Sequence, residues 1–524
     1  MDRGDIADLV ESFVTGTIHM REAGADGVEL FAAQGYLLSE FLSPHTNQRG
    51  DQYGGSLENR MRIIVEALQA MRKAVGRDFI IGLRMNGADH SPGGLVIEDS
   101  MAIARGLQAT GLLDYLNVSG MTYMQHPGWI ADITAPEAMF AEHAGRIRAA
   151  VPGMPICVAT RIATPDVAER ILESGQADLV GMVRALIADP EWPLKAQRGD
   201  VADIRQCTYS NQSCLMSLAQ GRGVSCMQNT AVGKEAQLGI GTMKPAARAR
   251  RVVVVCGGPA GMAAARIAAE RGHQVTVFEK DAQLGGQNRM TARIASRRGF
   301  AEVTRWQEHR LHRLGVKLCV GVAAEAASIL AEQPDAVVLA TGSVPRRDGY
   351  SSFRPDVATL AGVALPHVHT VWEAFTRPQD IGQSVLLIDE DPHLSGAYTA
   401  EYLATQGKHV QIVTPHLHPA AELHVNFAGE VYAHLMPLAV KVHPHTLVTE
   451  IAGRAVTCRD RYSERQTVLE DIDTVVLAMG NVAHNPLGEL LRGRVERLYT
   501  VGDCVAPRRI DDAIVDGERV GWMI

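Results

Sequence analysis

The chain has 524 residues, a length that usually divides into about three domains with separate hydrophobic cores. Hydrophobic residues make up 46% of the chain and charged residues 21%, which excludes disordered and fibrous proteins. The net charge is −8, and no basic stripe is interleaved with aromatic residues, so a nucleic-acid partner is not expected. No apolar run approaches the ~20 residues of a membrane span, and no signal-like core follows Met1, so we expect a cytoplasmic protein without a membrane partner.

Residues 1–200 alternate short apolar runs with longer helical patterns. Apolar residues recur at helical spacing over residues 57–75. The predicted strands are residues 27–31, 79–83, 115–118, 156–159 and 179–183. A complete β/α barrel takes eight such units and ~250 residues. Five units therefore predict either an open sheet or part of a barrel.

A nucleotide-binding βαβ pattern begins at Arg251. A run of valines opens directly into a glycine turn, where Gly258 and Gly261 favour close approach of a pyrophosphate to a helix N-terminus. Glu279 ends the next strand, where it would accept a hydrogen bond from a ribose hydroxyl. Cys256 stands in place of the first glycine and would crowd the turn. The pattern predicts a flavin or nicotinamide adenine dinucleotide site, and a sheet that binds nothing is the alternative.

A second strand, helix and strand follow at residues 384–388, 397–406 and 410–413. Where its glycine loop should lie, the chain has Asp389-Glu390-Asp391-Pro392. Three carboxylates repel a pyrophosphate, and proline lacks an N–H donor. This unit is predicted to have lost ordinary NAD(P)H binding. The later runs 475–480 and 498–503 are expected to complete the first unit.

Three cysteines fall in one short segment, at Cys207, Cys214 and Cys226. Three thiolates on a loop can ligate iron and sulfide, but four are usual for a cubane cluster. Ser210 stands where a fourth ligand would be expected. A labile cluster, a three-iron cluster, no cluster, and three free thiols therefore all remain open.

Several polar residues follow the predicted strands of the first region. Tyr36 comes just past the first strand, in position to donate a proton or a hydrogen bond to a substrate. Arg84, Arg161 and Arg184 follow three later strands. Arginines at successive strand ends would concentrate positive charge for a phosphate and an electron-rich ring.

The stretches 26–38, 41–47 and 53–60 resemble the Old Yellow Enzyme family of FMN-binding barrels. Together with the cysteine segment and the later nucleotide units, they resemble the fused subgroup that includes 2,4-dienoyl-CoA reductase, trimethylamine and histamine dehydrogenases and N-methylproline demethylase-like proteins. The resemblance implies an α/β chain with a partial (β/α)8 FMN barrel, units 4 to 8, over residues 1–200. An iron-sulfur-type segment would follow at 201–249. A disulfide-reductase-like FAD/NAD(P) Rossmann domain would span 250–380 and 466–524, with a degenerate Rossmann-like domain nested at 381–465.

The resemblance also implies residue roles. Arg84 would lie beside the flavin pyrimidine, and Arg161, Val183 and Arg184 would bind the FMN phosphate. Tyr36 would be the active-site tyrosine, and Cys207, Cys214 and Cys226 would be cluster ligands. Phe31 and Gln34 replace the usual polar pair of the substrate pocket, so ordinary enone binding is not expected. The implied contacts of FAD or ADP are Gly258, Gly261, Glu279, Gly286, Gln287, Thr341, Gly342, Gly502 and Asp503.

Three functional hypotheses follow. The first is a flavin-dependent amine dehydrogenase or N-demethylase that acts on a small molecule and passes electrons to an external acceptor such as an electron-transfer flavoprotein. The second is an NAD(P)H-dependent enoyl-CoA or enone reductase with Tyr36 as proton donor. The third is an impaired fragment that binds FAD or ADP, because the first three barrel units have no counterpart here; we favour a truncated gene model. A homo-oligomer is expected.

Overall fold

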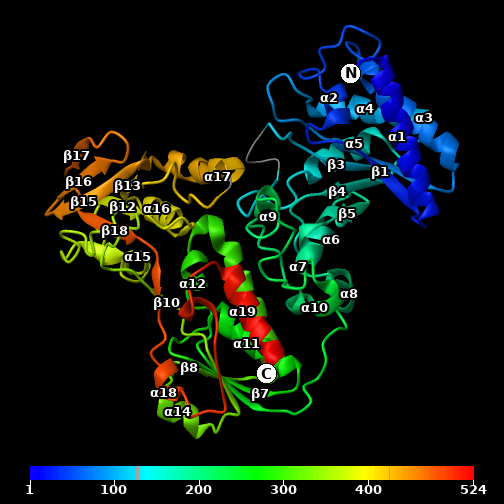
Figure 1. The fold of residues 1–524 in the computed structure, drawn as a ribbon. Helices are drawn as coiled ribbons and strands as arrows, with labels where there is room; N and C mark the ends of the chain where they lie inside the picture. The colour runs from blue at the N-terminus through cyan, green and yellow to red at the C-terminus, as the bar shows by residue number, and fades with distance from the viewer. Residues whose placement is uncertain (125–129, 424) are drawn as a thin grey trace. The chain divides into compact units, whose positions relative to one another are not determined.

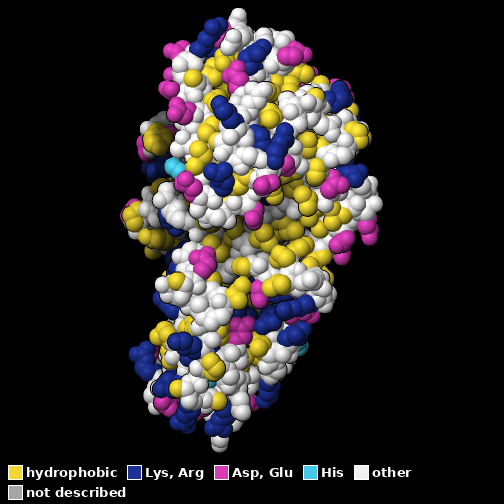
Figure 2. Space-filling model, turned by 90° about the vertical axis from the view of Figure 1, so that its right-hand side faces the viewer, with side chains coloured by type: hydrophobic (Ala, Val, Ile, Leu, Met, Phe, Trp, Pro, Cys, Tyr) yellow, Lys and Arg dark blue, Asp and Glu magenta, His cyan; other side chains and the backbone are white. Residues whose placement is uncertain are grey.

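The computed structural model describes residues 1–124, 130–423 and 425–524. The chain divides into two compact units, Met1–Leu186 and Ile187–Ile524 (Figure 1). No helix in the described ranges is long and apolar enough to cross a membrane. Lys and Arg side chains are interspersed with Asp and Glu on the face drawn in Figure 2.

The first unit is built on a five-stranded parallel sheet in the order β1-β2-β3-β4-β5. Its strands are β1 (Gly27–Ala32), β2 (Ile80–Asn86), β3 (Tyr115–Ser119), β4 (Ile156–Ala159) and β5 (Leu179–Gly181). Its helices are α1 (Arg3–Glu22), α2 (Leu37–Leu42), α3 (Leu57–Val75), α4 (Ile97–Thr110), α5 (Ala141–Ala150) and α6 (Pro165–Glu173), and α7 (Arg184–Ala188) begins at its end. The alternation of strand and helix confirms the predicted β/α units.

Side chains alternate between the two faces of this sheet, as the period of two in a strand requires. Leu30, Ile81, Leu83 and Leu116 are buried on one face. Glu29 belongs to the other, where its carboxylate accepts from Asn117 Nδ2 at 2.9 Å and from the Tyr115 hydroxyl at 3.0 Å. The face away from the core therefore carries polar groups together with Phe31.

Helix α3 has the predicted bounds because both ends are capped. The Ser56 hydroxyl accepts from the Asn59 N–H at 3.3 Å, and Gly76 ends the helix at φ 76°. Two predictions of strand bounds in this unit were wrong in detail. Arg84 lies inside β2 rather than after it, and β5 stops at Gly181, since the chain turns into α7 at Arg184.

Two five-stranded parallel sheets form the second unit, in the orders β20-β9-β6-β7-β8 and β11-β18-β12-β13-β14. The first contains β20 (Arg497–Thr500), β9 (Ala336–Leu339), β6 (Arg251–Val255), β7 (Gln274–Glu279) and β8 (Lys317–Val320). The second contains β11 (Val368–Thr370), β18 (Thr474–Ala478), β12 (Ser384–Asp389), β13 (His409–Val413) and β14 (Lys441–His443). Smaller sheets pair β10 (Ser343–Pro345) with β19 (Asn481–Ala483), and join β15 (Thr446–Ala452), β16 (Ala455–Asp460) and β17 (Gln466–Leu469).

The strand at 474–478 corrects the sequence prediction. Residues 475–480 were expected to complete the first nucleotide unit, but β18 pairs with β12 and β11 in the second sheet. Residues 498–503 supply β20, which pairs with β9 in the first sheet as expected. All five residues of β18 are buried, so its apolar run carried no information on which sheet it joins.

Helices cover both sheets, and α11 packs against α19 (Figure 1). Glycine explains this close approach, because a Cβ at Gly517 would lie 2.1 Å from the Ala260 carbonyl oxygen. Residues 201–249 contain only short helical segments. The helices of this unit are α8 (Trp192–Arg198), α9 (Leu215–Ala219), α10 (Glu235–Leu238), α11 (Pro259–Glu270), α12 (Asn288–Thr291), α13 (Ala301–Arg313), α14 (Ala326–Ala331), α15 (Val371–Thr376), α16 (Ser395–Thr405), α17 (Val425–Leu435), α18 (Gly488–Leu491) and α19 (Ile510–Met523).

Candidate functional site

Three aromatic side chains meet at the carboxyl ends of β1 and β3. The ring centroids of Phe31 and Tyr36 are 5.6 Å apart, and those of Tyr36 and Tyr123 are 6.2 Å apart. The rings are tilted by 63° and 50° and remain 37%, 47% and 43% exposed. We call Phe31, Tyr36 and Tyr123 the aromatic trio. Tilted, accessible rings present π faces and edges to a ligand.

Gln34 lies beside the trio in a left-handed backbone conformation, at φ 59°. Its N–H donates to Asn86 Oδ1 at 2.9 Å, and its Nε2 donates to the Ser119 hydroxyl at 3.4 Å. The turn after β1 thus presents a neutral amide. Tyr123 was not singled out by sequence, although its place soon after β3 matches that of Tyr36 after β1.

Arg84 projects from β2 toward the trio. Its guanidinium carbon lies 5.6 Å from the Phe31 ring centroid, and Nη2 donates to the Ser119 hydroxyl at 3.4 Å. Its Nε is buried without a hydrogen-bond partner. A buried cationic donor without an acceptor is costly unless a ligand supplies one. Arg84 therefore fits an electron-rich ring such as the flavin pyrimidine.

The two later arginines converge on one loop. Arg161 donates from Nε to the Ala135 carbonyl at 3.1 Å, and Arg184 donates from Nη1 to the Ala131 carbonyl at 2.6 Å. Arg161 has a φ of 60°, which turns the chain sharply after β4. Val183 is 68% exposed beside Arg184. The structure thus brings Arg161, Val183 and Arg184 to the carboxyl ends of β4 and β5, whereas Arg84 lies with the trio.

The glycine turn of the second unit connects β6 to α11, and each of its residues meets a different steric demand. A Cβ at Gly261 would lie 2.0 Å from the Cys256 carbonyl oxygen, so only glycine allows α11 to approach β6. A Cβ at Gly258 would meet nothing within 4 Å, and Gly258 lines a large cavity. Cys256 takes a φ of 79° in place of glycine. Burial and nearby Glu279 raise the pKa of its thiol to about 12, which favours the protonated form.

Glu279, at the end of β7, is held by backbone donors. Its Oε2 accepts from the Gly257 N–H at 2.8 Å, and its Oε1 accepts from the Asp281 N–H at 2.9 Å. It is buried but lines the same cavity as Gly258. The carboxylate is therefore fixed where a ribose would lie.

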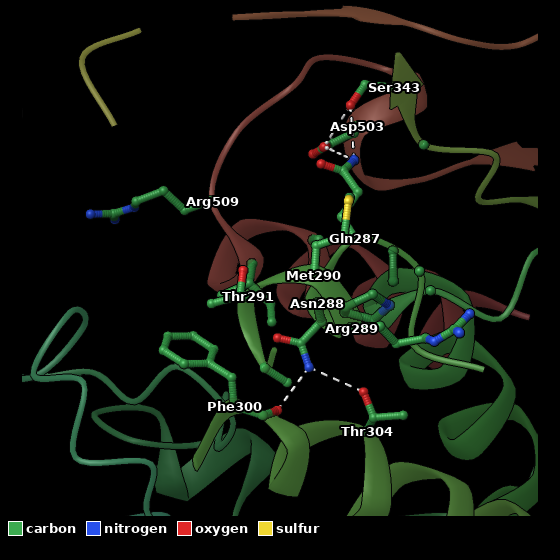
Figure 3. A pocket seen from close by; sticks show the side chains of 18 of the residues that line it. Gln287, Asn288, Arg289, Met290, Thr291, Phe300, Thr304, Ser343, Asp503 and Arg509 are labelled. Carbon is green, nitrogen blue, oxygen red and sulfur yellow. Dashed lines mark hydrogen bonds between the residues drawn. The ribbon is translucent and has the colours of Figure 1, made fainter. Parts of the chain in front are cut away.

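This cavity has a volume of about 1850 Å³ and is lined by loops of both sheets. Gln287, Ser343 and Asp503 point toward one another in it (Figure 3). Gln287 Nε2 donates to Ser343 Oγ at 3.0 Å, and Ser343 Oγ donates to Asp503 Oδ2 at 3.0 Å. Asn481 Nδ2 also donates to Ser343 Oγ at 3.0 Å. Burial raises the pKa of Asp503.

The glycines that directly precede Gln287, Ser343 and Asp503 have positive φ angles. They occur at Gly286 (51°), Gly342 (74°) and Gly502 (68°). Thr341, whose hydroxyl donates to the His484 carbonyl, completes the loop. The open face of Gly258 and this polar group fit an adenine dinucleotide. Ser343 and Asn481 were not predicted from the sequence, although Ser343 directly follows Thr341-Gly342.

The turn after β12 is filled by Asp389. Its carboxylate is fully buried, and a Cβ at Gly396 would lie 2.1 Å from Asp389 Oδ1. The carboxyl group therefore occupies the space at the first turn of α16, where a pyrophosphate would approach. Burial raises the pKa of Asp389 well above its usual range, and the charges of Asp391 and Glu390 add to this effect.

Asp389→Asn is expected to flatten the pH dependence of folding stability. Because the native pKa lies above the unfolded value, the folded state holds the proton more tightly, and stability falls as pH rises between the two values. Each unit by which the pKa is raised corresponds to ~1.4 kcal/mol. Denaturant unfolding at pH 5 and pH 8 measures this difference. Asp356→Asn, at an exposed position, is the control, and an unchanged slope in D389N would contradict the account.

In the described part of the chain, Cys207, Cys214 and Cys226 are not joined in disulfides, and all three are partly exposed. Ser210 Oγ lies 3.3 Å from Thr208 Oγ1 and 3.9 Å from Met227 Sδ. In the described part of the chain, no three His, Cys, Asp or Glu side chains are grouped to hold a metal ion. A hydroxyl is a poor substitute for thiolate, so these residues do not fit a four-thiolate cluster.

Comparison with known proteins identifies the family. Residues 1–202 match the NADH:flavin oxidoreductase / NADH oxidase family, and residues 250–378 match the pyridine nucleotide-disulphide oxidoreductases. An N,N-dimethylglycine/sarcosine dehydrogenase from Chromohalobacter salexigens is 34% identical, over 99% of this chain and 79% of the relative. A probable N-methylproline demethylase from Rhizobium meliloti is 36% identical, over 78% of this chain and 59% of the relative.

Solved structures of flavoenzymes also match this chain. A 2-naphthoyl-CoA reductase matches with a TM-score of 0.93 and 31% identity, over 100% of this chain and 77% of that chain. Histamine dehydrogenase from Rhizobium sp. 4-9 matches with a TM-score of 0.91 and 26% identity, over 99% and 77%. The protein is thus a flavin-dependent oxidoreductase with FMN-type and FAD-type domains. It belongs to the NADH:flavin oxidoreductase family, in the form fused to a pyridine nucleotide-disulphide oxidoreductase domain.

Proposed function

We propose that this enzyme oxidises a secondary or tertiary amine at the C–H bond beside nitrogen. The observation that carries the proposal is the aromatic trio next to Arg84, with Gln34 where an imidazole donor would be needed to polarise an enone. Aromatic faces bind alkylated amines by cation–π attraction and by contact with their methyl groups. The similarity to an N,N-dimethylglycine/sarcosine dehydrogenase and to histamine dehydrogenase supports the same chemistry.

In this reaction the substrate C–H bond gives up a proton and two electrons, and water hydrolyses the resulting iminium ion to an amine, an aldehyde and a proton. Bound FMN would supply the acceptor for the electron pair. Arg84, Arg161, Val183 and Arg184 would hold the FMN, while Phe31 and Gln34 shape the pocket and Tyr36 contacts the substrate. FAD or ADP would bind the cavity of the second unit through Gly258, Gly261, Glu279, Gly286, Gln287, Thr341, Gly342, Gly502 and Asp503.

We assign electron exit to an external acceptor, such as an electron-transfer flavoprotein, rather than to NAD(P)H. The buried Asp389 at the second glycine turn supports this assignment. Cys207, Cys214 and Cys226 have no role in this electron transfer, since Ser210 replaces the fourth thiolate. The expected setting is the cytoplasm, and the expected assembly is a homo-oligomer.

A second candidate is an NAD(P)H-dependent enoyl-CoA or enone reductase. The similarity to 2-naphthoyl-CoA reductase favours it, and the accessible Tyr36 hydroxyl would be its proton donor. The impaired flavin- or ADP-binding fragment is the third candidate, and Ser210 and Cys256 favour it.

Steady-state turnover separates these candidates. With trimethylamine and an artificial electron acceptor, the purified protein is expected to release formaldehyde at a rate that saturates with amine. Trimethylamine, dimethylamine and sarcosine form the substrate series, and 2-cyclohexenone with NADH tests the reductase. Enone reduction without amine oxidation would refute the proposal in favour of the reductase, and inactivity in both assays would favour the impaired fragment.

A further inference from the structure

Glu40 lies at the edge of the aromatic trio. It sits one helical turn after Tyr36, with its backbone N–H donating to the Tyr36 carbonyl at 2.9 Å. Its Oε1 accepts from the Tyr123 hydroxyl at 3.0 Å. The side chain is only partly buried. The Glu40 carboxylate is thus hydrogen-bonded to Tyr123, and its backbone is hydrogen-bonded to Tyr36.

The charge of this carboxylate is not neutralised by a neighbour. Among the described residues, no Lys or Arg forms an ion pair with Glu40, and its side-chain bond is to the neutral Tyr123 phenol. That bond raises the pKa of Tyr123, so the phenol keeps its proton. The guanidinium of Arg84 lies against the Phe31 ring, with its carbon 5.6 Å from the ring centroid.

Resting on the proposed amine oxidation, we propose that Glu40 selects cationic amines without a carboxylate over N-methyl amino acids. An ammonium ion among the three rings gains cation–π attraction and the Coulomb attraction of Glu40. A substrate that also carries a carboxylate brings a second negative charge toward Glu40. Glu40 is therefore a specificity-determining residue that acts through charge rather than through the chemical step.

Two unreactive probes test this charge selection on the flavin-loaded full chain. Tetramethylammonium is a bare cation, and glycine betaine is a trimethylammonium that bears a carboxylate. Isothermal titration is expected to show tighter binding of tetramethylammonium. Glu40→Gln should weaken its binding about 5- to 10-fold, the size of one screened ion pair near 4 Å, and should not weaken betaine binding.

Two controls isolate the carboxylate. Glu22→Gln makes the same change in net charge at an exposed position and should leave both affinities unchanged. Tyr123→Phe removes the hydrogen bond but keeps the Glu40 charge, so the preference for the bare cation should persist.

The outcomes separate this inference from the proposed function. Unchanged tetramethylammonium binding in E40Q, equal binding of both probes by the unaltered chain, or binding of neither would overturn the role of Glu40. If amines are oxidised in any of these cases, the proposed function stands alone. If the cation preference depends on Glu40 but no amine is oxidised, the charge selection stands and the proposed function fails.

Discussion

Ser210→Cys is expected to raise the iron and sulfide content of the purified protein from far below one cluster per chain to roughly four of each. The reason is the donor set. Cys207, Cys214 and Cys226 supply three thiols in one segment, and Ser210 supplies a hydroxyl whose pKa is too high to give a good ligand. A cysteine side chain differs from serine mainly in the size of one atom, so the segment should accept it.

Chemical iron and sulfide assays after anaerobic reconstitution measure this effect. Ser217→Cys is the matched control, because it adds a thiol to the same segment on α9, away from the ligand spacing. Cys214→Ser in the Ser210→Cys background should remove the gain. A full complement of four irons in the unaltered protein would show that Ser210 does not prevent assembly.

Arg84→Ala is expected to yield protein that has lost FMN while retaining its FAD-site nucleotide. Arg84 Nε is buried without a hydrogen-bond partner among the described residues, and a bound ring would accept from it. A hydrogen bond to a charged group contributes about 1.5–3 kcal/mol, so the FMN dissociation constant should rise about 10- to 150-fold. Arg84→Lys keeps the charge but loses the planar fork, and an intermediate loss is expected.

The nucleotide of the second unit serves as an internal reference, since Arg84 belongs to the first unit. Chromatography of the released cofactors gives the ratio of FMN to FAD in each variant. Arg146→Ala, which removes an exposed ion pair with Glu98, should leave that ratio unchanged. An equal ratio in Arg84→Ala and the unaltered protein would contradict the assignment of Arg84 to FMN.

Local pattern was sufficient to predict the five strands of the first unit and several strands of the second. The five β/α strands, helix α3 and the valine strand β6 followed from runs and periodicity of apolar residues. The partner of each strand could not be predicted in the same way. A strand buried on both faces, such as β18, has an apolar sequence that would suit either sheet.

The candidate sites were predictable where one backbone motif holds them and not where tertiary structure assembles them. Gly258, Gly261 and Glu279 lie in one strand-turn-helix-strand unit. Ser343 and Asn481 meet only because β10 pairs with β19 across more than a hundred residues of sequence. Glu40 belongs to α2 and Tyr123 follows β3, so the sequence did not show that the two residues form a hydrogen bond beside the trio.

Anaerobic mixing of the flavin-loaded enzyme with a single reductant tests the central claim most directly. The account predicts that trimethylamine or dimethylamine bleaches the flavin absorbance, while NADH and NADPH do so far more slowly. Rapid bleaching by NADH or NADPH, with colour restored by an enone and no response to amines, would contradict it.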